Sequence, residues 1–344
     1  MPVEQFPPRP VTLTAMNTTS TSAPSPSASA DATTTPSALP LRHLLVPFDF
    51  SSGARQTAAA AVALARPAGA RLTLLYVLPV TLPANIGHVS VVLDNGKLLA
   101  NAREQLTAFA QSAIPAEIPV DIQVAEGGPY HEINATARAL GTDLIVIGTR
   151  GLSGVKHLVL SSTAERVVRH APCPVLTWHI SADAPTAATP APPSVPPAPA
   201  FQHLLVPVDF SPANDEALRH AVRFASTFGS QITLLHVIEP PPYPEWGYAH
   251  LTRRDEALKL EARKKLDTLV TDLHCQGCRV NPARITTGDA DTQIARVADE
   301  LHPDLIILAT HGHSALTQMF LGGTTERVVR HAACPVLVVR AKTT

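Results

Sequence analysis

The stretch HLLVPFDFS at residues 43–51 decides the fold, because it returns as HLLVPVDFS at residues 203–211. A second block, ERVVRHA at residues 165–171, returns at residues 326–332. The two offsets, 160 and 161 residues, are nearly equal, so the chain contains one unit twice. Solenoid repeats are far shorter, and each copy is long enough to bury its own core. The sequence therefore predicts two whole domains in tandem.

Two changes in composition predict the boundaries of these domains. In the N-terminal tail, residues 1–40, Ser, Thr, Ala or Pro occupy 21 of the 24 positions from 17 to 40, and such a segment is expected to be disordered. Residues 181–200 hold seven Pro and seven Ala, which is typical of a semi-rigid interdomain linker. We therefore expect domains at residues 41–180 and 201–344.

The bulk composition argues against several classes of function. The 27 Lys and Arg nearly balance the 28 Asp and Glu, and only 4% of residues are aromatic, so nucleic acid is not an expected partner. No apolar run approaches the ~20 residues of a membrane span, and the N-terminus lacks the pattern of a secretory signal. We expect a soluble, cytoplasmic protein that has no membrane partner.

The four cysteines do not predict a disulfide framework in a chain of this length. Cys173 and Cys334 occupy equivalent places in the two copies and are interpreted as small core residues. Cys275 and Cys278 have C-x-x-C spacing, but no second pair of zinc ligands lies nearby and the motif follows a helical pattern rather than opening one. We interpret this pair as structural.

Each copy alternates short apolar runs with helical patterns, as parallel sheets with crossover helices do. After the first strand of the second copy, Ser211-Pro212 predicts a helix N-cap followed by Pro at the first helical position, and Gly229 predicts the end of that helix. Residues 143–147 and 305–308 are almost wholly apolar, as strands buried on both faces are. The expected fold class is α/β, with two doubly wound domains, each a five-stranded parallel sheet with flanking helices.

The last strands, expected at residues 174–178 and 335–339, are short and apolar and fall at the sheet edge, where unpaired strands seek partners. We predict that they pair the two copies into an intramolecular pseudo-dimer, while a homo-oligomer of whole chains stays open. The i,i+4 pairs Glu165/Arg169 and Glu326/Arg330 are interpreted as bracing a solvent-facing helix.

Small and hydroxyl residues gather at the carboxyl ends of the expected strands, where doubly wound sheets place their ligands. Residues 148–154 (GTRGLSG) and 309–315 (ATHGHSA) follow the fourth strand of each copy. Residues 161–163 (SST) and 322–324 (GGT) precede the ERVVR helix, whose N-terminal N–H groups favour an anion. The chain contains neither a Walker loop nor G-x-G-x-x-G.

With these motifs, and with DLIVIGTRG at residues 143–151 and ERVVRHAPCPVL at residues 165–176, the chain resembles the universal stress protein family twice over. The resemblance covers about residues 41–180 and 201–342. It implies a Rossmann-like fold of the adenine nucleotide alpha hydrolase type and pairing through the last strand. One branch of that family binds ATP through a G-x2-G-x9-G-(S/T) signature, and another branch lacks the signature and does not bind ATP.

The resemblance also implies which residues hold the nucleotide. Asp49 and Asp209 match the acidic residue that contacts the nucleoside, and Val77 and Val237 match the position that contacts adenine through backbone groups. The candidate binding residues are Asp49, Val77, Gly148, Arg150, Gly151, Ser161, Ser162 and Thr163 in the first copy, and Asp209, Val237, His311, Gly312, Gly322, Gly323 and Thr324 in the second.

Neither copy matches the signature fully, and the departures differ between the copies. Ser161 stands where the binders have Gly, so its Cβ crowds a phosphate unless the backbone there has an ordinary φ, in which case its hydroxyl is a donor. In the second copy, Ala309 replaces the first Gly, and Gly323 lacks a hydroxyl worth about 1 kcal/mol. These changes weaken binding without preventing it.

A simpler interpretation of the same residues stays open. The glycines then serve strand-to-helix turns, and Arg150 and His311 are solvated. Each of the two aspartates caps the helix that follows, together with the serine two places on. We expect ATP, with Mg²⁺, to bind at least one copy of a regulatory stress-response protein. No catalytic triad, Cys-His pair or metal cluster recurs in both copies, so we expect no enzyme, with weak ATP hydrolysis left open. The alternative is an interaction scaffold of the same fold without a ligand.

Overall fold

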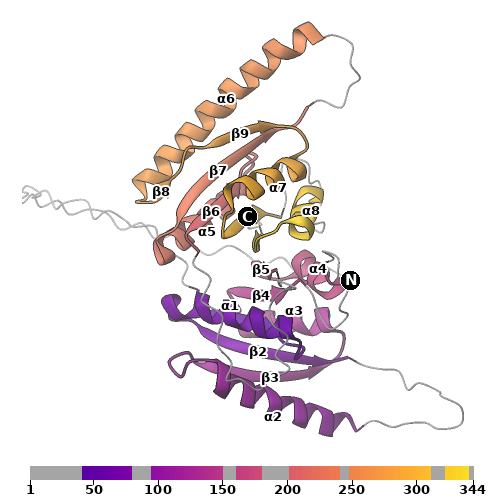
Figure 1. Ribbon diagram of the computed structural model, residues 1–344. Helices are drawn as coiled ribbons and strands as arrows, with labels where there is room; N and C mark the ends of the chain where they lie inside the picture. Colours follow the sequence, from indigo (N-terminus) through magenta and orange to yellow (C-terminus); the bar gives the residue numbers. More distant parts are fainter. Residues whose placement is uncertain are drawn as a thin grey trace, which may run out of the picture. The chain divides into compact units, whose positions relative to one another are not determined.

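The first copy folds as the expected parallel sheet with helices on both faces (Figure 1). A computed structural model describes residues 41–79, 94–149, 160–179, 201–240, 248–310 and 322–340, so the expected tail and linker lie outside the described residues. Five strands run in the order β3-β2-β1-β4-β5, all parallel. The elements are β1 (His43–Pro47), α1 (Ser52–Ala68), β2 (Arg71–Leu78), α2 (Asn95–Ala113), β3 (Val120–Glu126), α3 (Pro129–Leu140), β4 (Leu144–Gly148), α4 (Ser162–His170) and β5 (Val175–Trp178).

The second copy repeats this order, but its edge strand is divided in two. Asn281 lies in the break, where its N–H donates to Ile232 O (2.8 Å) and its side chain donates to Thr233 Oγ1 (3.1 Å). Both pieces, β8 and β9, pair with β7. The elements are β6 (His203–Pro207), α5 (Asn214–Phe228), β7 (Gln231–Ile238), α6 (Tyr248–Cys275), β8 (Arg279–Val280), β9 (Arg284–Thr287), α7 (Ala290–Leu301), β10 (Leu305–Ala309), α8 (Gly323–His331) and β11 (Val336–Val339). No helix in the described residues is both long enough and apolar enough to span a membrane.

The last strands of the two copies pair with each other, as predicted. β5 and β11 run antiparallel, with Leu176 opposite Leu337 and Thr177 opposite Val336. The Thr177 hydroxyl also donates to Val336 O at 3.1 Å. Through this pair the strands of both copies form a single sheet, β3-β2-β1-β4-β5-β11-β10-β6-β7-β8, with β9 also bonded to β7. The chain therefore forms an intramolecular pair of domains.

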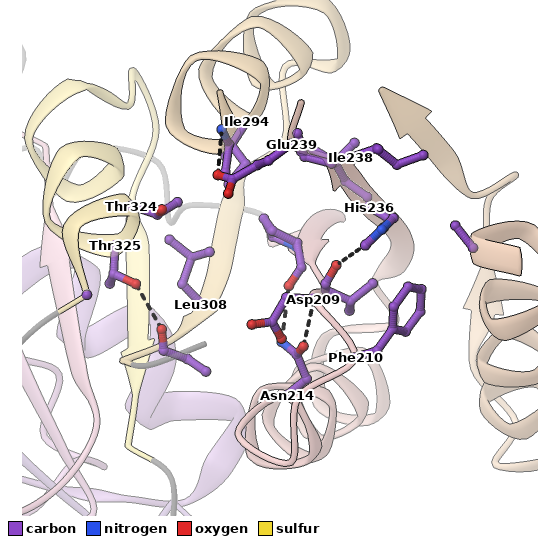
Figure 2. Close-up of a pocket in the computed structure, with 18 of the residues that line it drawn as sticks. Asp209, Phe210, Asn214, His236, Ile238, Glu239, Ile294, Leu308, Thr324 and Thr325 are labelled. Carbon is purple, nitrogen blue, oxygen red and sulfur yellow. Dashed lines mark hydrogen bonds between the residues drawn. The ribbon is translucent and has the colours of Figure 1, made fainter. Parts of the chain in front are cut away.

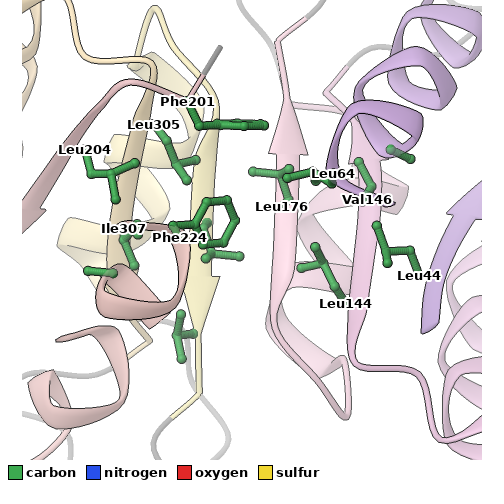
Figure 3. Packing of buried hydrophobic residues seen from close by; sticks show 14 of the residues in the cluster. Leu44, Leu64, Leu144, Val146, Leu176, Phe201, Leu204, Phe224, Leu305 and Ile307 are labelled. Carbon is green, nitrogen blue, oxygen red and sulfur yellow. The ribbon is translucent and has the colours of Figure 1, made fainter. Parts of the chain in front are cut away.

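The core lies on both faces of this sheet. Because successive side chains of a strand point to opposite faces, Leu44 and Val46 pack in one cluster and Leu45 in the other. Both clusters contain residues from both copies, so the hydrophobic layers continue across the join. Figure 3 shows the cluster that contains Leu44, with Leu176 of the first copy and Phe201 of the second on either side of the join.

The first helices of the two copies begin differently, and the predicted N-cap at Ser211 is wrong. In the first copy Ser51 caps α1, since its Oγ accepts from Ala54 N at 3.0 Å. In the second copy the chain makes an extra turn and α5 begins only at Asn214. The Asn214 side chain stabilises this turn by accepting from Asp209 N (2.7 Å) and donating to Pro207 O (3.4 Å). Gly229 ends α5 with φ 68°, as predicted.

The two Glu/Arg pairs form one group of four charges between α4 and α8, which extends the predicted helix-bracing role. Arg169 contacts Glu165 (3.2 Å) and also Glu326 of the other copy (3.3 Å). Arg330 contacts Glu326 (3.0 Å) and also Glu165 (3.6 Å). The Arg side chains are 28% and 39% exposed, so these charges are partly shielded from solvent and link the two copies.

Thiol reactivity tests the structural interpretation of the cysteines, all four of which are free. Cys275 is exposed, whereas burial raises the pKa of Cys173 and Cys334 to about 12 and also raises the pKa of Cys278. For Cys173 and Cys334 this rise lowers the thiolate fraction at pH 8 by roughly 1,000-fold. We expect one thiol per chain to react rapidly with Ellman's reagent at pH 8 and the other three only after unfolding in urea. Two or more rapidly reacting thiols in the folded chain would contradict this assignment.

Candidate functional site

The turn after the first strand of each copy contains a strained phenylalanine. Phe50 and Phe210 have φ of 63° and 61°, a region that bulky residues rarely adopt. The aspartate before each Phe accepts from the serine N–H that follows, at 3.1 Å for Asp49 and 2.9 Å for Asp209. The two aspartates therefore bond to this turn. In the first copy Ser51 caps α1 while its N–H and hydroxyl both bond to Asp49, which matches the alternative in which the aspartate and this serine cap the helix together. In the second copy Ser211 does not cap α5.

In the second copy this turn borders a cavity of about 550 Å³ at the carboxyl ends of β6, β7 and β10 (Figure 2). Its volume lies within the usual range for small-molecule sites, roughly 300–1,000 Å³. Five of the predicted binding residues line it: Asp209, Val237, Gly322, Gly323 and Thr324. Three separate parts of the sequence thus come together at the place where doubly wound sheets bind their ligands.

One end of the cavity is the N-terminus of α8. Its N-cap, Gly322, has no side chain to bond the first N–H groups, and the Thr325 hydroxyl donates instead to Ala309 O at 2.9 Å. The first N–H groups of a helix have no intrahelical acceptor and carry its positive dipole end. Gly322 has an ordinary φ of −59°, but a Cβ there would lie 3.1 Å from Thr310 O. Glycine at this position therefore avoids a tight contact with Thr310 O, although its φ is one that other residues adopt.

The corresponding helix end in the first copy is occupied by its own side chain. Ser161 has a φ of −62°, and its Oγ accepts from Ala164 N at 3.1 Å, which makes it the N-cap of α4. The Ser51 hydroxyl donates to Asp49 Oδ1 at 2.5 Å, while the equivalent Ser211 hydroxyl has no hydrogen-bond partner in the described part of the chain. Polar groups that the resemblance assigns to a ligand are thus bonded within the protein in the first copy.

Another part of the cavity wall exposes backbone groups of β7. Leu235 O accepts from Val208 N (2.8 Å), the first residue after β6, so this residue of β7 faces β6. Alternate residues of a strand face the same neighbour, so the backbone groups of Val237 also face that side. β6 has already ended there, at Pro207. Val237 therefore offers a donor and an acceptor beside the cavity.

The opposite wall consists of residues that the sequence analysis missed. The rings of Phe210 and His236 lie 4.5 Å apart, and His236 Nδ1 donates to Val208 O at 2.8 Å. Lys265 of α6 lies 5.3 Å from the centre of the Phe210 ring and 2.7 Å from Glu261, whose pKa it lowers through this hydrogen bond. In the sequence, the i,i+4 spacing of Glu261 and Lys265 on a charged helix was the signal that could have pointed to this wall of the cavity.

The predicted residues of the first copy that the structure describes do not line this cavity. Val77 and Gly148 lie at the carboxyl-terminal parts of β2 and β4, and Ser162 and Thr163 lie in the first turn of α4. The loop candidates Arg150, Gly151, His311 and Gly312 lie outside the described residues. Within the described ranges, no three His, Cys, Asp or Glu side chains are grouped as a metal site, and this includes the C-x-x-C pair.

Comparison with known proteins agrees with the duplicated architecture. The model of the universal stress protein family matches residues 40–179 and again residues 200–340. The chain belongs to the universal stress protein family. A universal stress protein of Mycolicibacterium smegmatis is 27% identical over 293 residues, which cover 79% of this chain and 91% of that protein. Universal stress protein MJ0577 of Methanocaldococcus jannaschii is 29% identical over 157 residues, covering 41% of this chain and 96% of the relative.

A solved structure shows the same fold over both domains of this universal stress protein. The crystal structure of a universal stress protein from Archaeoglobus fulgidus aligns with a TM-score of 0.59 and 21% identity. The alignment covers 87% of this chain and 96% of that one. The tandem arrangement of universal stress protein domains is therefore present in a structure determined by experiment.

Proposed function

We propose that this tandem universal stress protein binds an adenine nucleotide, ATP with Mg²⁺, in its second domain and acts as a cytoplasmic regulatory module. The observation that carries the proposal is the 550 Å³ cavity, which connects the uncapped N-terminus of α8 with the backbone groups of Val237. An anionic group and a base need these two features at opposite ends of a site. Free cysteines accord with a reducing compartment.

The chemistry of the lining supports a nucleotide more than other anions of similar size. The N–H groups at the start of α8 suit phosphate oxygens. Asp209 lines the same cavity, where its carboxylate is an acceptor for ribose hydroxyls. The Phe210 and His236 rings supply apolar surface beside the base. Mg²⁺ usually remains on the phosphates and keeps several waters, so it does not need a dedicated group of protein ligands.

The second domain is the better candidate because no side chain caps the N-terminus of its helix α8. A phosphate at α4 in the first domain must displace the Ser161 hydroxyl from Ala164 N, whereas Gly322 leaves no such bond to break. In addition, the first domain has Phe48 at the position where the second domain has Val208. The Phe48 ring packs against the Phe109 ring, with ring centres 4.6 Å apart. We therefore expect one site per chain.

Equilibrium dialysis of the intact chain against radiolabelled ATP and Mg²⁺ tests the proposal. We expect saturable retention of one nucleotide per chain. Retention of two would show that both domains bind, which contradicts the restriction to the second domain. No retention at millimolar ATP would overturn nucleotide binding and leave the interaction scaffold as the function of this fold.

A further inference from the structure

Arg327 lies at the edge of the cavity, beside the proposed phosphate end. It is on α8 four residues after Gly323, and its Nη2 is 4.0 Å from the place of a Cβ on Gly323. Side chains of a helix lean toward its N-terminus, so Arg327 covers the first turn of α8. Because Gly323 has no side chain, nothing from that residue separates the guanidinium from an anion bound at the first N–H groups.

The guanidinium has one partner in the described part of the chain, and that partner is exchangeable. Arg327 Nη1 is 3.1 Å from Asp291 Oδ1 in the first turn of α7. The Arg327 side chain is 63% exposed, and exposed ion pairs of this kind contribute little to stability. Phosphate oxygens accept two parallel hydrogen bonds from Arg and carry more charge than one carboxylate. A phosphate at this place therefore competes well with Asp291.

We propose that Arg327 is a specificity-determining residue that contacts the outermost phosphate and makes the site select nucleoside di- and triphosphates over monophosphates. The inference rests on the proposed function of the same cavity. Arg327 does not itself line the cavity, and its Nη2 lies 4.0 Å from the place of a Cβ on Gly323, which does line it. A single phosphate at the N–H groups of α8 satisfies the helix end, and only a longer phosphate chain extends to the guanidinium.

The equivalent arginine of the first domain is held differently. Arg166 lies 5.1 Å from the centre of the Tyr130 ring, and this tyrosine replaces Asp291 at the equivalent place on the neighbouring helix. A guanidinium that packs over an aromatic ring is held by the ring and not by a carboxylate that a phosphate can replace. The selection by phosphate number is therefore a property of the second domain, and Arg166 provides a matched control.

Dialysis of the full chain against ATP, ADP and AMP, each with Mg²⁺ at one ionic strength, tests the inference. We expect Arg327→Gln to raise the Kd for ATP and ADP by roughly 10- to 100-fold and to change the Kd for AMP by less than about two-fold. Arg327→Lys keeps the charge but loses the paired donors, so an intermediate effect is expected. Asp291→Asn removes the competing carboxylate and is expected to tighten ATP binding.

Two controls separate a local effect from a general loss of positive charge. Arg166→Gln and Arg296→Gln each remove one partly exposed arginine, and we expect neither to change the ratio of the AMP and ATP affinities. An equal loss for ATP and AMP in Arg327→Gln, or no loss, would overturn the role of Arg327 while leaving nucleotide binding intact. Failure of the unaltered chain to bind any nucleotide would overturn both proposals.

Discussion

Leu176→Ala and Leu337→Ala are each expected to lower the free energy of unfolding by about 2–5 kcal/mol, the usual range for a fully buried leucine. Both side chains have 0% exposure. They lie opposite each other in β5 and β11, at the only place where strands of the two domains pair within the described residues. Each substitution leaves a cavity that the facing domain borders, so the effect reaches beyond the domain that carries it.

The double variant distinguishes a shared core from two separate ones. Residues in direct contact usually show coupling of about 0.5–3 kcal/mol, whereas distant sites add to within roughly 0.5 kcal/mol. We expect coupling between Leu176→Ala and Leu337→Ala in urea unfolding, and additivity between Leu106→Ala and Leu337→Ala. Leu106 is a matched control, since it is equally buried but lies on α2. Additive effects in the first pair would mean that the two domains unfold independently.

Asp209→Ala is expected to raise the Kd for ATP by roughly 10- to 100-fold, since a hydrogen bond to a charged group contributes about 1.5–3 kcal/mol. Asp209 lines the cavity together with Gly323 and Val237. Asp49→Ala is the matched control, because each aspartate accepts from the N–H of the serine two residues later. We expect Asp49→Ala to change the Kd by less than about two-fold.

Dialysis of both variants, with thermal unfolding measured alongside, checks this prediction. Both substitutions remove the bond to the serine N–H in the Phe turn, and Asp49→Ala also removes the bond from the Ser51 hydroxyl, so a loss of stability is expected in both. A loss of ATP affinity in Asp49→Ala as large as in Asp209→Ala would place binding in both domains. Unchanged affinity in both variants would mean that the cavity binds ATP without the carboxylate, which contradicts the assigned role.

Most of the secondary structure is predictable because it depends on neighbouring residues. The apolar runs at residues 143–147 and 305–308 predict β4 and β10 to within a residue. Gly229 ends α5 because it adopts φ 68° without a steric penalty. The pairing of β5 with β11 is also predictable, since a short apolar strand at an edge needs a partner.

The start of α5 and the far wall of the cavity were not predictable from local patterns. Ser211-Pro212 has the form of a helix start, but Asn214 bonds to Asp209 and Pro207 and shifts the start to residue 214. Lys265 lies on a helix more than 50 residues from Phe210, and only the packing of α6 against β7 and β9 brings them together. A local sequence pattern does not show which residues lie close together in space when they are this far apart in the chain.

What the sequence by itself determined is the duplication, the α/β class, the order of elements and the family, because repeated motifs and the periods of apolar residues are properties of nearby positions. The tertiary structure decided which copy has an open site. The difference depends on whether Ser161 or Gly322 precedes the helix, and on what each neighbouring side chain bonds to. The tertiary structure also decided that Arg169 and Arg330 each contact a glutamate of the other domain. Hydrogen bonds and ion pairs are satisfied by whichever groups lie within about 3 Å, and only the folded chain fixes those neighbours.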